Sequence, residues 1–331
     1  MLIGIFRSNK PIVLIYLPFV AAALWIFSFI SPASLISQTN DVQSTMPLYK
    51  LFIWLLGESK IIANISGILI LIIQSIILNN IIIKNQILSR SNYLPALLYL
   101  VLMSCFPSLL TLHPELFANF FLIIALGRLL TIYRQENIFQ YVFDAGFYIG
   151  IASLFYFPVI ILCPFVWISL IILRAFAWRE WIIPLIGLIV PYLFVIVYYF
   201  WFDMLDSLWY ESIVLPIVNK SYKIVINKSF YLLFGILFII IFLSLRNFSV
   251  SLRINTVRVR QLLTVLIWFF IFSLLSVLIA PSYSINSFAL IAIPLSVYVT
   301  NYLLSLQGSW RPEAVFLVLI GTIVFVQVVN L

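Results

Sequence analysis

Long, uninterrupted runs of apolar residues are the feature that most limits what this chain can fold into. The run Ile61–Ile83 holds 23 residues and no charged side chain. About 20 residues of helix cross a hydrocarbon core some 30 Å thick, and runs of this length are typical of membrane spans. Comparable runs recur to the end of the chain, so the sequence predicts an all-α, polytopic transmembrane helix bundle.

The composition excludes several classes of soluble protein. Of the 331 residues, 65% are hydrophobic and 8% are charged, whereas soluble domains are about half apolar and a quarter charged. A water-soluble enzyme, a disordered chain and a nucleic-acid-binding protein are therefore excluded. The net charge of +8 reflects membrane topology, because 13 of the 18 lysines and arginines fall on one predicted side of the membrane.

We predict eleven spans, because the stretch Ala145–Leu173 divides into two short helices. It has 29 residues, too many for one span, and Pro158 and Pro164 interrupt it. Little of the chain remains for a soluble domain. The other nine spans are Pro11–Ile30, Ile61–Ile83, Tyr93–Leu112, Leu116–Tyr133, Trp181–Trp201, Phe230–Leu245, Gln261–Ala280, Ser284–Leu303 and Glu313–Leu331.

The distribution of basic residues predicts the orientation. With eleven spans, the segment Arg246–Arg260 and its four arginines share one side with Arg7 and Lys10, which precede the first span like those of a signal anchor. That side is cytoplasmic by the positive-inside rule. A single span over Ala145–Leu173 would place those four arginines outside. We therefore expect a bacterial inner-membrane protein with its N-terminus inside and its C-terminus outside.

Two large loops are expected on the outer side, at residues 31–60 and 202–228. We assign residues 1–228, with both loops, to one transmembrane module and residues 229–331 to a C-terminal four-helix segment. Most of the acids and the single histidine also fall outside. Whatever polar chemistry the protein performs should therefore lie between these loops, above a helix bundle that keeps a lipid tail in the membrane.

The first outer loop contains a candidate catalytic acid, Asp41. The apolar stretch Met46–Leu56 after it is too short to span and is predicted to lie in the interface, with Tyr49 and Trp54 at head-group depth. Asp41 could serve as a general base towards an acceptor hydroxyl, or bind a divalent cation, the one cofactor that these acids would suit. The alternative is a solvated loop aspartate.

A shorter outer loop carries His113 and Glu115 around Pro114. Pro114 fits the first turn of the next helix, and Glu115 would face the positive end of the helix dipole. Both residues could thus be ordinary helix-start residues. They are also the only ionisable pair on this part of the outer side of the bundle. A histidine beside a glutamate can titrate near neutral pH. Asn119, one turn further, needs a partner inside the bundle.

The second large outer loop offers a weaker metal site and a lipid site. Asp203 and Asp206 are three residues apart and would share one helical face. They could hold a cation there, or they could be part of a solvent-exposed amphipathic turn. Tyr210 beside them suits the interface. Lys220 and Lys223 could hold a lipid phosphate, or mark an exposed loop end.

Other functional signatures are missing from the sequence. Cys105 and Cys163 lie in apolar runs without a second thiol nearby, which gives neither a disulfide framework nor a metal or redox motif. No P-loop or dinucleotide motif is present. No string of acids within the spans marks an ion pathway, which weakens a transporter or pump.

The order of these features resembles the GT-C superfamily of integral-membrane glycosyltransferases, which use polyprenyl-phosphate-linked sugars. The similar elements include a first outer loop with Asp41, a helix containing Pro47–Leu48–Tyr49 and ending at Gly57, and a second span. Further along, the similar segments are Pro114 with Asn119, A-L-G-R-L-L, A-G-F-Y-I-G-I-A-S-L-F-Y-F-P at Ala145–Pro158, and Arg179 with Trp181 before I-I-P-L-I-G-L-I-V-P. The resemblance covers about the first two thirds of the chain.

The resemblance implies a protein that binds a polyprenyl-phosphate-linked substrate and, where active, transfers the glycosyl group on the periplasmic face with inversion. Asp41 would be the base, and His113 and Glu115 would be orienting or metal-linked groups. The residues next to the lipid phosphate would be Lys220, Lys223, Tyr49 and Tyr210. Membrane lipids are the expected partners.

Two departures favour another reading. The family usually places a second acid beside the loop-one aspartate, where this chain has Val42, and a histidine before a Pro-Pro pair, where it has T-M-P. The chain is also similar to uncharacterised multi-pass proteins of the Bacteroidota. The alternative function is a catalytically silent scaffold, a membrane subunit of a secretion or gliding-motility complex, whose partners would be other envelope proteins.

Overall fold

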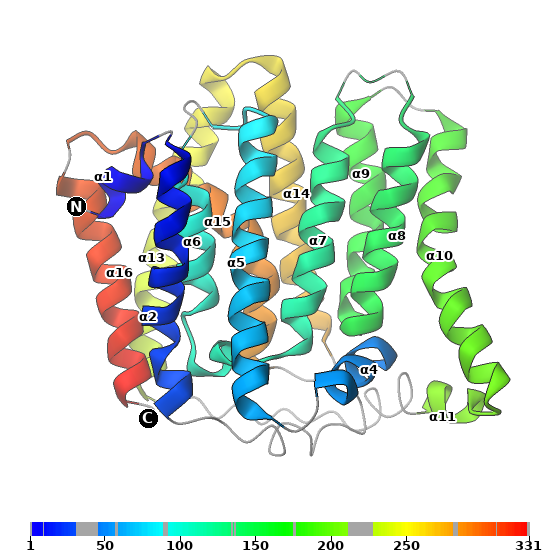
Figure 1. The fold of residues 1–331 in the computed structure, drawn as a ribbon. Helices are drawn as coiled ribbons and strands as arrows, with labels where there is room; N and C mark the ends of the chain where they lie inside the picture. Colours follow the sequence, from blue (N-terminus) through cyan, green and yellow to red (C-terminus); the bar gives the residue numbers. More distant parts are fainter. Residues whose placement is uncertain are drawn as a thin grey trace.

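The computed structural model shows a bundle of long helices that lie side by side (Figure 1). It describes residues 2–8, 10–30, 46–56, 59–88, 92–133, 135, 137–174, 177–210, 228–280, 284–308 and 310–329. Within these ranges every regular element is helical. The elements are α1 Leu2–Phe6, η1 Pro11–Ile15, α2 Tyr16–Ile30, α4 Pro47–Leu56, α5 Lys60–Lys84, α6 Leu94–Met103, η3 Pro107–Leu110, α7 Pro114–Leu130, α8 Phe139–Phe155, η4 Phe157–Leu162, α9 Cys163–Leu173, α10 Trp178–Trp201, α11 Leu205–Trp209, α13 Lys228–Ile254, α14 Val257–Ile279, η6 Ile285–Ser287, α15 Phe288–Ser305 and α16 Trp310–Val329.

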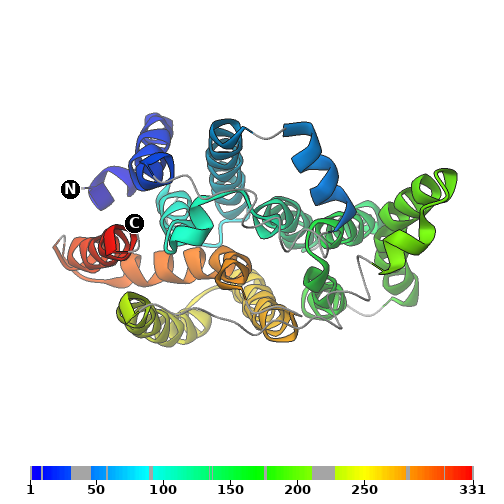
Figure 2. The same ribbon diagram turned by 90° about the horizontal axis from the view of Figure 1, so that it is seen from below.

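Six of the described helices are long and apolar enough to cross a membrane: α5, α10, α13, α14, α15 and α16. Their burial differs widely, from 78% of the apolar window of α15 to 17% of that of α10. Viewed along the helix axes, α15 lies between α6 on one side and α13 and α14 on the other (Figure 2), and it packs against all three. The C-terminal segment thus supplies the central helix of the bundle.

The predicted break in the fifth apolar stretch is confirmed. Helix α8 ends at Phe155, and Tyr156 is extended, with φ −142° and ψ 102°. The 3-10 helix η4 begins next, with Pro158 in its first turn, and α9 follows with Pro164 in its own first turn. A proline lacks an N–H and cannot continue the preceding helical hydrogen bonds, so the two prolines set where each new helix starts.

Helix α10 is held to the bundle by glycines. A Cβ on Gly146 of α8 would overlap the Pro184 carbonyl of α10, and one on Gly187 of α10 would overlap the Phe143 carbonyl of α8. A Cβ on Gly150 would lie 2.7 Å from the Leu188 oxygen. Small residues at such crossings let two helix backbones approach closely inside a membrane.

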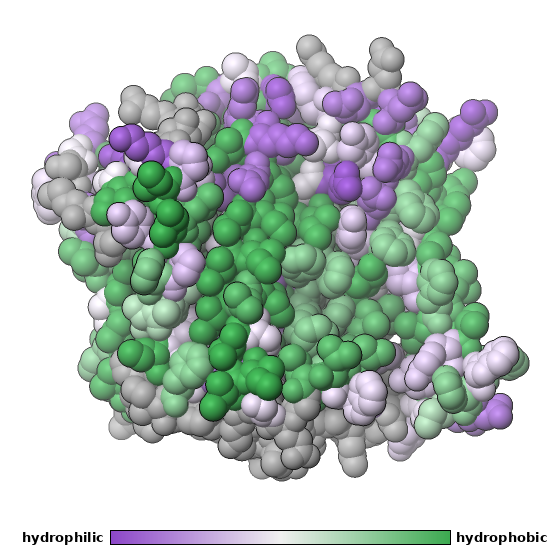
Figure 3. All heavy atoms as spheres, viewed as in Figure 1, coloured by the Kyte–Doolittle hydropathy of each residue, from purple (hydrophilic) through white to green (hydrophobic). Residues whose placement is uncertain are grey.

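Charged side chains collect at one end of the bundle, which we call the basic end. Figure 3 shows hydrophilic residues along this end and a broad apolar band below it. Ion pairs there join successive helices: Arg128 and Asp144 lie 3.3 Å apart, and Arg174 and Glu180 lie 3.7 Å apart. Helices α4 and α11 lie at the opposite end (Figure 1), which we call the outer end.

Candidate functional site

The candidate site is built around Glu115 and His113 at the outer end, where α7 begins. Pro114 occupies the first helical turn, and His113 before it is extended. Glu115 is 2% exposed and His113 is 1% exposed. Charged groups are rarely buried to this degree, so both side chains are more than the wetted helix-start residues that the sequence alone allowed.

In each of these two side chains, one polar atom has a hydrogen-bond partner and the other has none among the described residues. Ser284 donates a hydrogen bond of 3.2 Å to Oε1 of Glu115, and Nδ1 of His113 lies 2.7 Å from the Thr111 carbonyl oxygen. Since a carbonyl only accepts, Nδ1 carries the imidazole proton and Nε2 is an acceptor. Glu115 Oε2 and His113 Nε2 are buried and have no hydrogen-bond partner among the described residues.

Burial shifts the two groups towards their neutral forms. It raises the pKa of Glu115 to about 7, against the smaller effects of hydrogen bonds from its own backbone and from Ser284. It lowers the pKa of His113 to about 4, opposed by the hydrogen bond with Thr111. At neutral pH the imidazole is therefore uncharged, while the carboxyl group is close to half ionised. A carboxyl group in this state can both take up and release a proton.

A line of hydroxyl groups leads away from Glu115. Ser284 Oγ lies 3.2 Å from Ser287 Oγ, which lies 2.9 Å from the Tyr156 hydroxyl. Ser284 precedes η6 and Ser287 ends it, whereas Tyr156 lies in the break between α8 and η4. Segments far apart in the chain therefore meet at this site.

Helix α4 covers the start of α7 through Tyr49. The Tyr49 hydroxyl donates a hydrogen bond of 3.2 Å to the Leu112 carbonyl. The rings of Tyr49 and Phe52 pack on Phe117, whose ring stacks on Phe155 at 5.2 Å. Burial, and after it the charge of Glu115, raises the pKa of Tyr49. The predicted interfacial helix is thus confirmed as a helix and contributes to the site.

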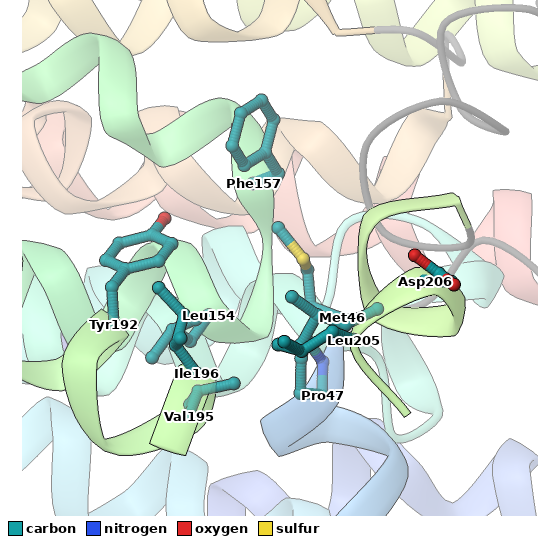
Figure 4. Close-up of a pocket in the computed structure, with 10 residues that line it drawn as sticks. Met46, Pro47, Leu154, Phe157, Tyr192, Val195, Ile196, Leu205 and Asp206 are labelled. Carbon is teal, nitrogen blue, oxygen red and sulfur yellow. The ribbon is translucent and has the colours of Figure 1, made fainter. Parts of the chain in front are cut away.

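An apolar cavity of about 410 Å³ lies beside this cluster, between α4, the end of α8, α10 and α11 (Figure 4). Its polar groups are few. The Tyr192 hydroxyl lies 2.7 Å from Ser153 Oγ, and Asp206 is exposed at the edge. The cavity and the Glu115 cluster share their walls, because α4 and the α8–η4 break contribute to both. The other lining residues are Met46, Pro47, Leu154, Phe157, Val195, Ile196, Leu205 and Leu208.

A second polar layer lies deeper in the bundle. Asn119 donates a hydrogen bond of 2.7 Å to the Ala289 carbonyl of α15. Gln74 donates one of 2.6 Å to the Leu116 carbonyl and accepts one of 2.8 Å from Tyr99. These bonds fix the first turns of α7 against α5 and α15, and the partner expected for Asn119 is present.

The remaining predicted residues have mixed outcomes. Asp41, Lys220 and Lys223 lie outside the described residues. Asp203 and Asp206 do not share a helical face, contrary to our prediction: Asp203 is in a turn with φ 52°, and α11 begins only at Leu205. Tyr210, which follows α11, is exposed. The described residues contain no group of three or more side chains suited to a metal ion.

Sequence reasoning missed Ser284, Ser287 and Tyr156. None of them belongs to a recognisable motif, and serines occur throughout the chain. A signal was nevertheless present, because the predicted topology places Ser284, Glu115 and the break after Phe155 on the outer side. Only the packing of α15 against α7 brings the hydroxyl groups to the carboxylate.

A family model, described as a family of unknown function (DUF6427), matches residues 34–331. The match covers most of the chain, which therefore belongs to this family. The comparison with curated proteins and the comparison with solved structures each gave no match.

Proposed function

We propose that this member of the DUF6427 family is a GT-C-like inner-membrane protein that binds a polyprenyl-phosphate-linked sugar and transfers the glycosyl group on the periplasmic side. The observation that carries the proposal is a buried carboxyl group, Glu115, with one unpartnered oxygen and an apolar cavity beside it. Proton-transfer chemistry and a hydrocarbon-binding surface are the two elements that such a reaction requires.

The chemistry follows from the two protonation states. In an inverting transfer, the acceptor oxygen bonds to the anomeric carbon, the bond from that carbon to the phosphate oxygen breaks, and the acceptor loses its proton. A base with a pKa near 7 suits that task at neutral pH, and the pKa of Glu115 is about 7. Uncharged His113 offers Nε2 as a hydrogen-bond acceptor to orient a hydroxyl group.

The lipid part of the substrate would occupy the cavity. Its walls are almost entirely aliphatic and aromatic, and they would replace lipid around a hydrocarbon chain without cost to polar groups. Lys220 and Lys223 remain our proposed contacts for the phosphate. Asp41 remains the base that the GT-C resemblance implies, and Glu115 is our second candidate for that role. Substitution of each, one at a time, tests these roles.

We also propose eleven spans, with the N-terminus in the cytoplasm. They keep the bounds predicted from the sequence and contain most of α2, α5 to α10 and α13 to α16, so shorter apolar helices are included beside the six long ones. Support comes from the basic end, where Arg7 bonds to the end of α15, Arg174 to the α7–α8 connection, and Arg258 covers the Tyr133 ring. Clustered arginines are typical of the cytoplasmic side.

The test is native mass spectrometry of the protein purified in a gentle amphiphile. We expect a co-purified polyprenyl phosphate or its sugar adduct. Leu154→Trp should fill the cavity and remove this lipid, whereas Leu193→Trp, on the exposed side of α10, should retain it. Glu115→Gln should keep the lipid but abolish transfer to an added acceptor.

Two results would contradict the proposal. Stoichiometric partner proteins without any polyprenyl lipid would indicate the catalytically silent scaffold instead. Equal loss of lipid in Leu154→Trp and Leu193→Trp would show that the cavity is not its site.

A further inference from the structure

The strongest unassigned feature is the unbroken chain of hydroxyl groups that ends on Glu115. From the carboxylate outwards, its members are Ser284, Ser287 and Tyr156, with successive separations of 3.2, 3.2 and 2.9 Å. A hydroxyl group can donate one hydrogen bond while it accepts another. The chain therefore has the chemistry needed to pass a proton from one end to the other.

We propose that Ser284, Ser287 and Tyr156 form a proton relay that connects Glu115 to the cavity beside the α8–η4 break. This inference rests on the proposed function and deepens it, because it identifies how a proton released near the cavity reaches a carboxylate buried behind α4. Tyr156 directly precedes Phe157 and lies two residues after Leu154, and both of these residues line the cavity. The relay thus begins at the residue next to the cavity wall.

The proton balance is simple. The acceptor hydroxyl gives its proton to Tyr156 as its oxygen bonds to the anomeric carbon, and the phosphate leaves with the electrons of the broken C–O bond. Tyr156 passes its own proton to Ser287, Ser287 passes one to Ser284, and Ser284 passes one to Glu115. Each hydroxyl ends as it began, and Glu115 gains one proton.

The groups around the carboxylate favour this direction. His113 precedes it, Tyr49 faces it from α4, and Tyr156 faces it from the α8–η4 break. Burial, and after it the charge of Glu115, raises the pKa of Tyr49. This tyrosine therefore stays protonated, and protons collect on the carboxylate. Among the described residues, no cation pairs with Glu115.

A purely structural role is the competing explanation. The same bonds tie the α14–α15 connection to the α8–η4 break, and they would stabilise the fold without conducting anything. The two roles differ in one respect. Ser284 is exposed to water, and only a relay would carry proton exchange from Ser284 through Ser287 to the Tyr156 hydroxyl.

The experiment is infrared spectroscopy of the intact protein in the amphiphile. The phenol band lost in Tyr156→Phe identifies this residue, and its shift after transfer to D₂O gives the exchange rate of the Tyr156 hydroxyl proton. We expect Ser284→Ala and Ser287→Ala each to slow this exchange at least tenfold. Ser273→Ala is the matched control, since the buried Ser273 hydroxyl bonds only within its own helix.

Exchange of the Tyr156 hydroxyl at the wild-type rate in both Ser284→Ala and Ser287→Ala would overturn the relay. If Ser287→Ala does not fold, Ser287→Thr restores a hydroxyl group and should exchange normally, while Ser284→Ala still tests the chain. The outcome is independent of lipid retention. Slowed exchange without bound polyprenyl lipid would keep the relay and refute the transferase, and the reverse result would keep the transferase and refute the relay.

Discussion

At the scale of single residues, burial shifts the pKa values of Glu115 and His113 in opposite directions. Both lose hydration, and in each case the charged form is penalised. An acid is neutral when protonated, whereas an imidazole is neutral when deprotonated. The same surroundings therefore raise one pKa and lower the other. The result is a site with a neutral imidazole and a carboxyl group that is only about half ionised at neutral pH, which suits its place in a mostly apolar bundle.

This difference predicts how stability depends on pH. The pKa of Glu115 is about 7 in the folded protein and 4.5 in the unfolded chain. Its contribution to the free energy of unfolding is therefore fully present below pH 4.5 and is lost as the pH rises to 7. Thermal unfolding of wild type and Glu115→Gln should show this. The free energy of unfolding of wild type, relative to that of Glu115→Gln, should fall by up to about 3 kcal/mol between pH 5 and 8. His113 contributes with the opposite sign between pH 4 and 6.5 and cancels in the comparison. A constant difference would contradict the burial of Glu115.

At the scale of elements, α8 organises the outer end. It packs against α7, α10, η4 and α4, so the Glu115 cluster and the cavity share it as a wall. Its glycines let α10 approach closely, although α10 is otherwise the least buried of the long helices. The position of α10, and hence the width of the cavity, depends largely on this crossing.

Gly146→Leu should therefore displace α10. The new side chain would overlap the Pro184 carbonyl, which cannot move without its helix, and forced overpacking costs about 1–3 kcal/mol. We expect a lower midpoint of thermal unfolding and weaker retention of lipid. The control is Gly235→Leu in α13, where a Cβ has no neighbour within 4 Å. Similar losses in both variants would show that helix propensity and not the crossing is responsible.

At the scale of the whole molecule, two ends of different character explain the orientation that we propose. The basic end holds the arginines and their ion pairs, and the outer end holds the buried acid, the cavity and two short helices (Figure 1). Moving arginines across a membrane is costly, and we therefore propose that the basic end lies in the cytoplasm.

Cysteine labelling in intact cells tests this orientation. With both native cysteines replaced by alanine, Met204→Cys beside α11 should react with a membrane-impermeant maleimide. Ile254→Cys at the end of α13 should react only after permeabilisation. Both side chains are well exposed, so accessibility within the fold does not bias the comparison. The opposite pattern would invert the topology and place the Glu115 site in the cytoplasm.

Sequence alone determined the all-helical class, the apolar helices long enough to span a membrane, the helix at Pro47–Leu56 and the break between α8 and η4. These follow from local features, the length of apolar runs and the position of prolines, which do not depend on packing. It also identified His113 and Glu115. It could not distinguish buried site residues from solvent-exposed residues at a helix start, because burial depends on which segments cover a residue.

Only the tertiary structure decided what surrounds them. The packing of α15 on α7 brings Ser284 to Glu115, and α4 closes over the start of α7 through Tyr49. Glycines set the close approach of α8 and α10, two of the helices that line the cavity. In a membrane protein, lipid-facing and protein-facing sides of a helix are equally apolar, so composition cannot reveal which helices meet, and the site arises where they do.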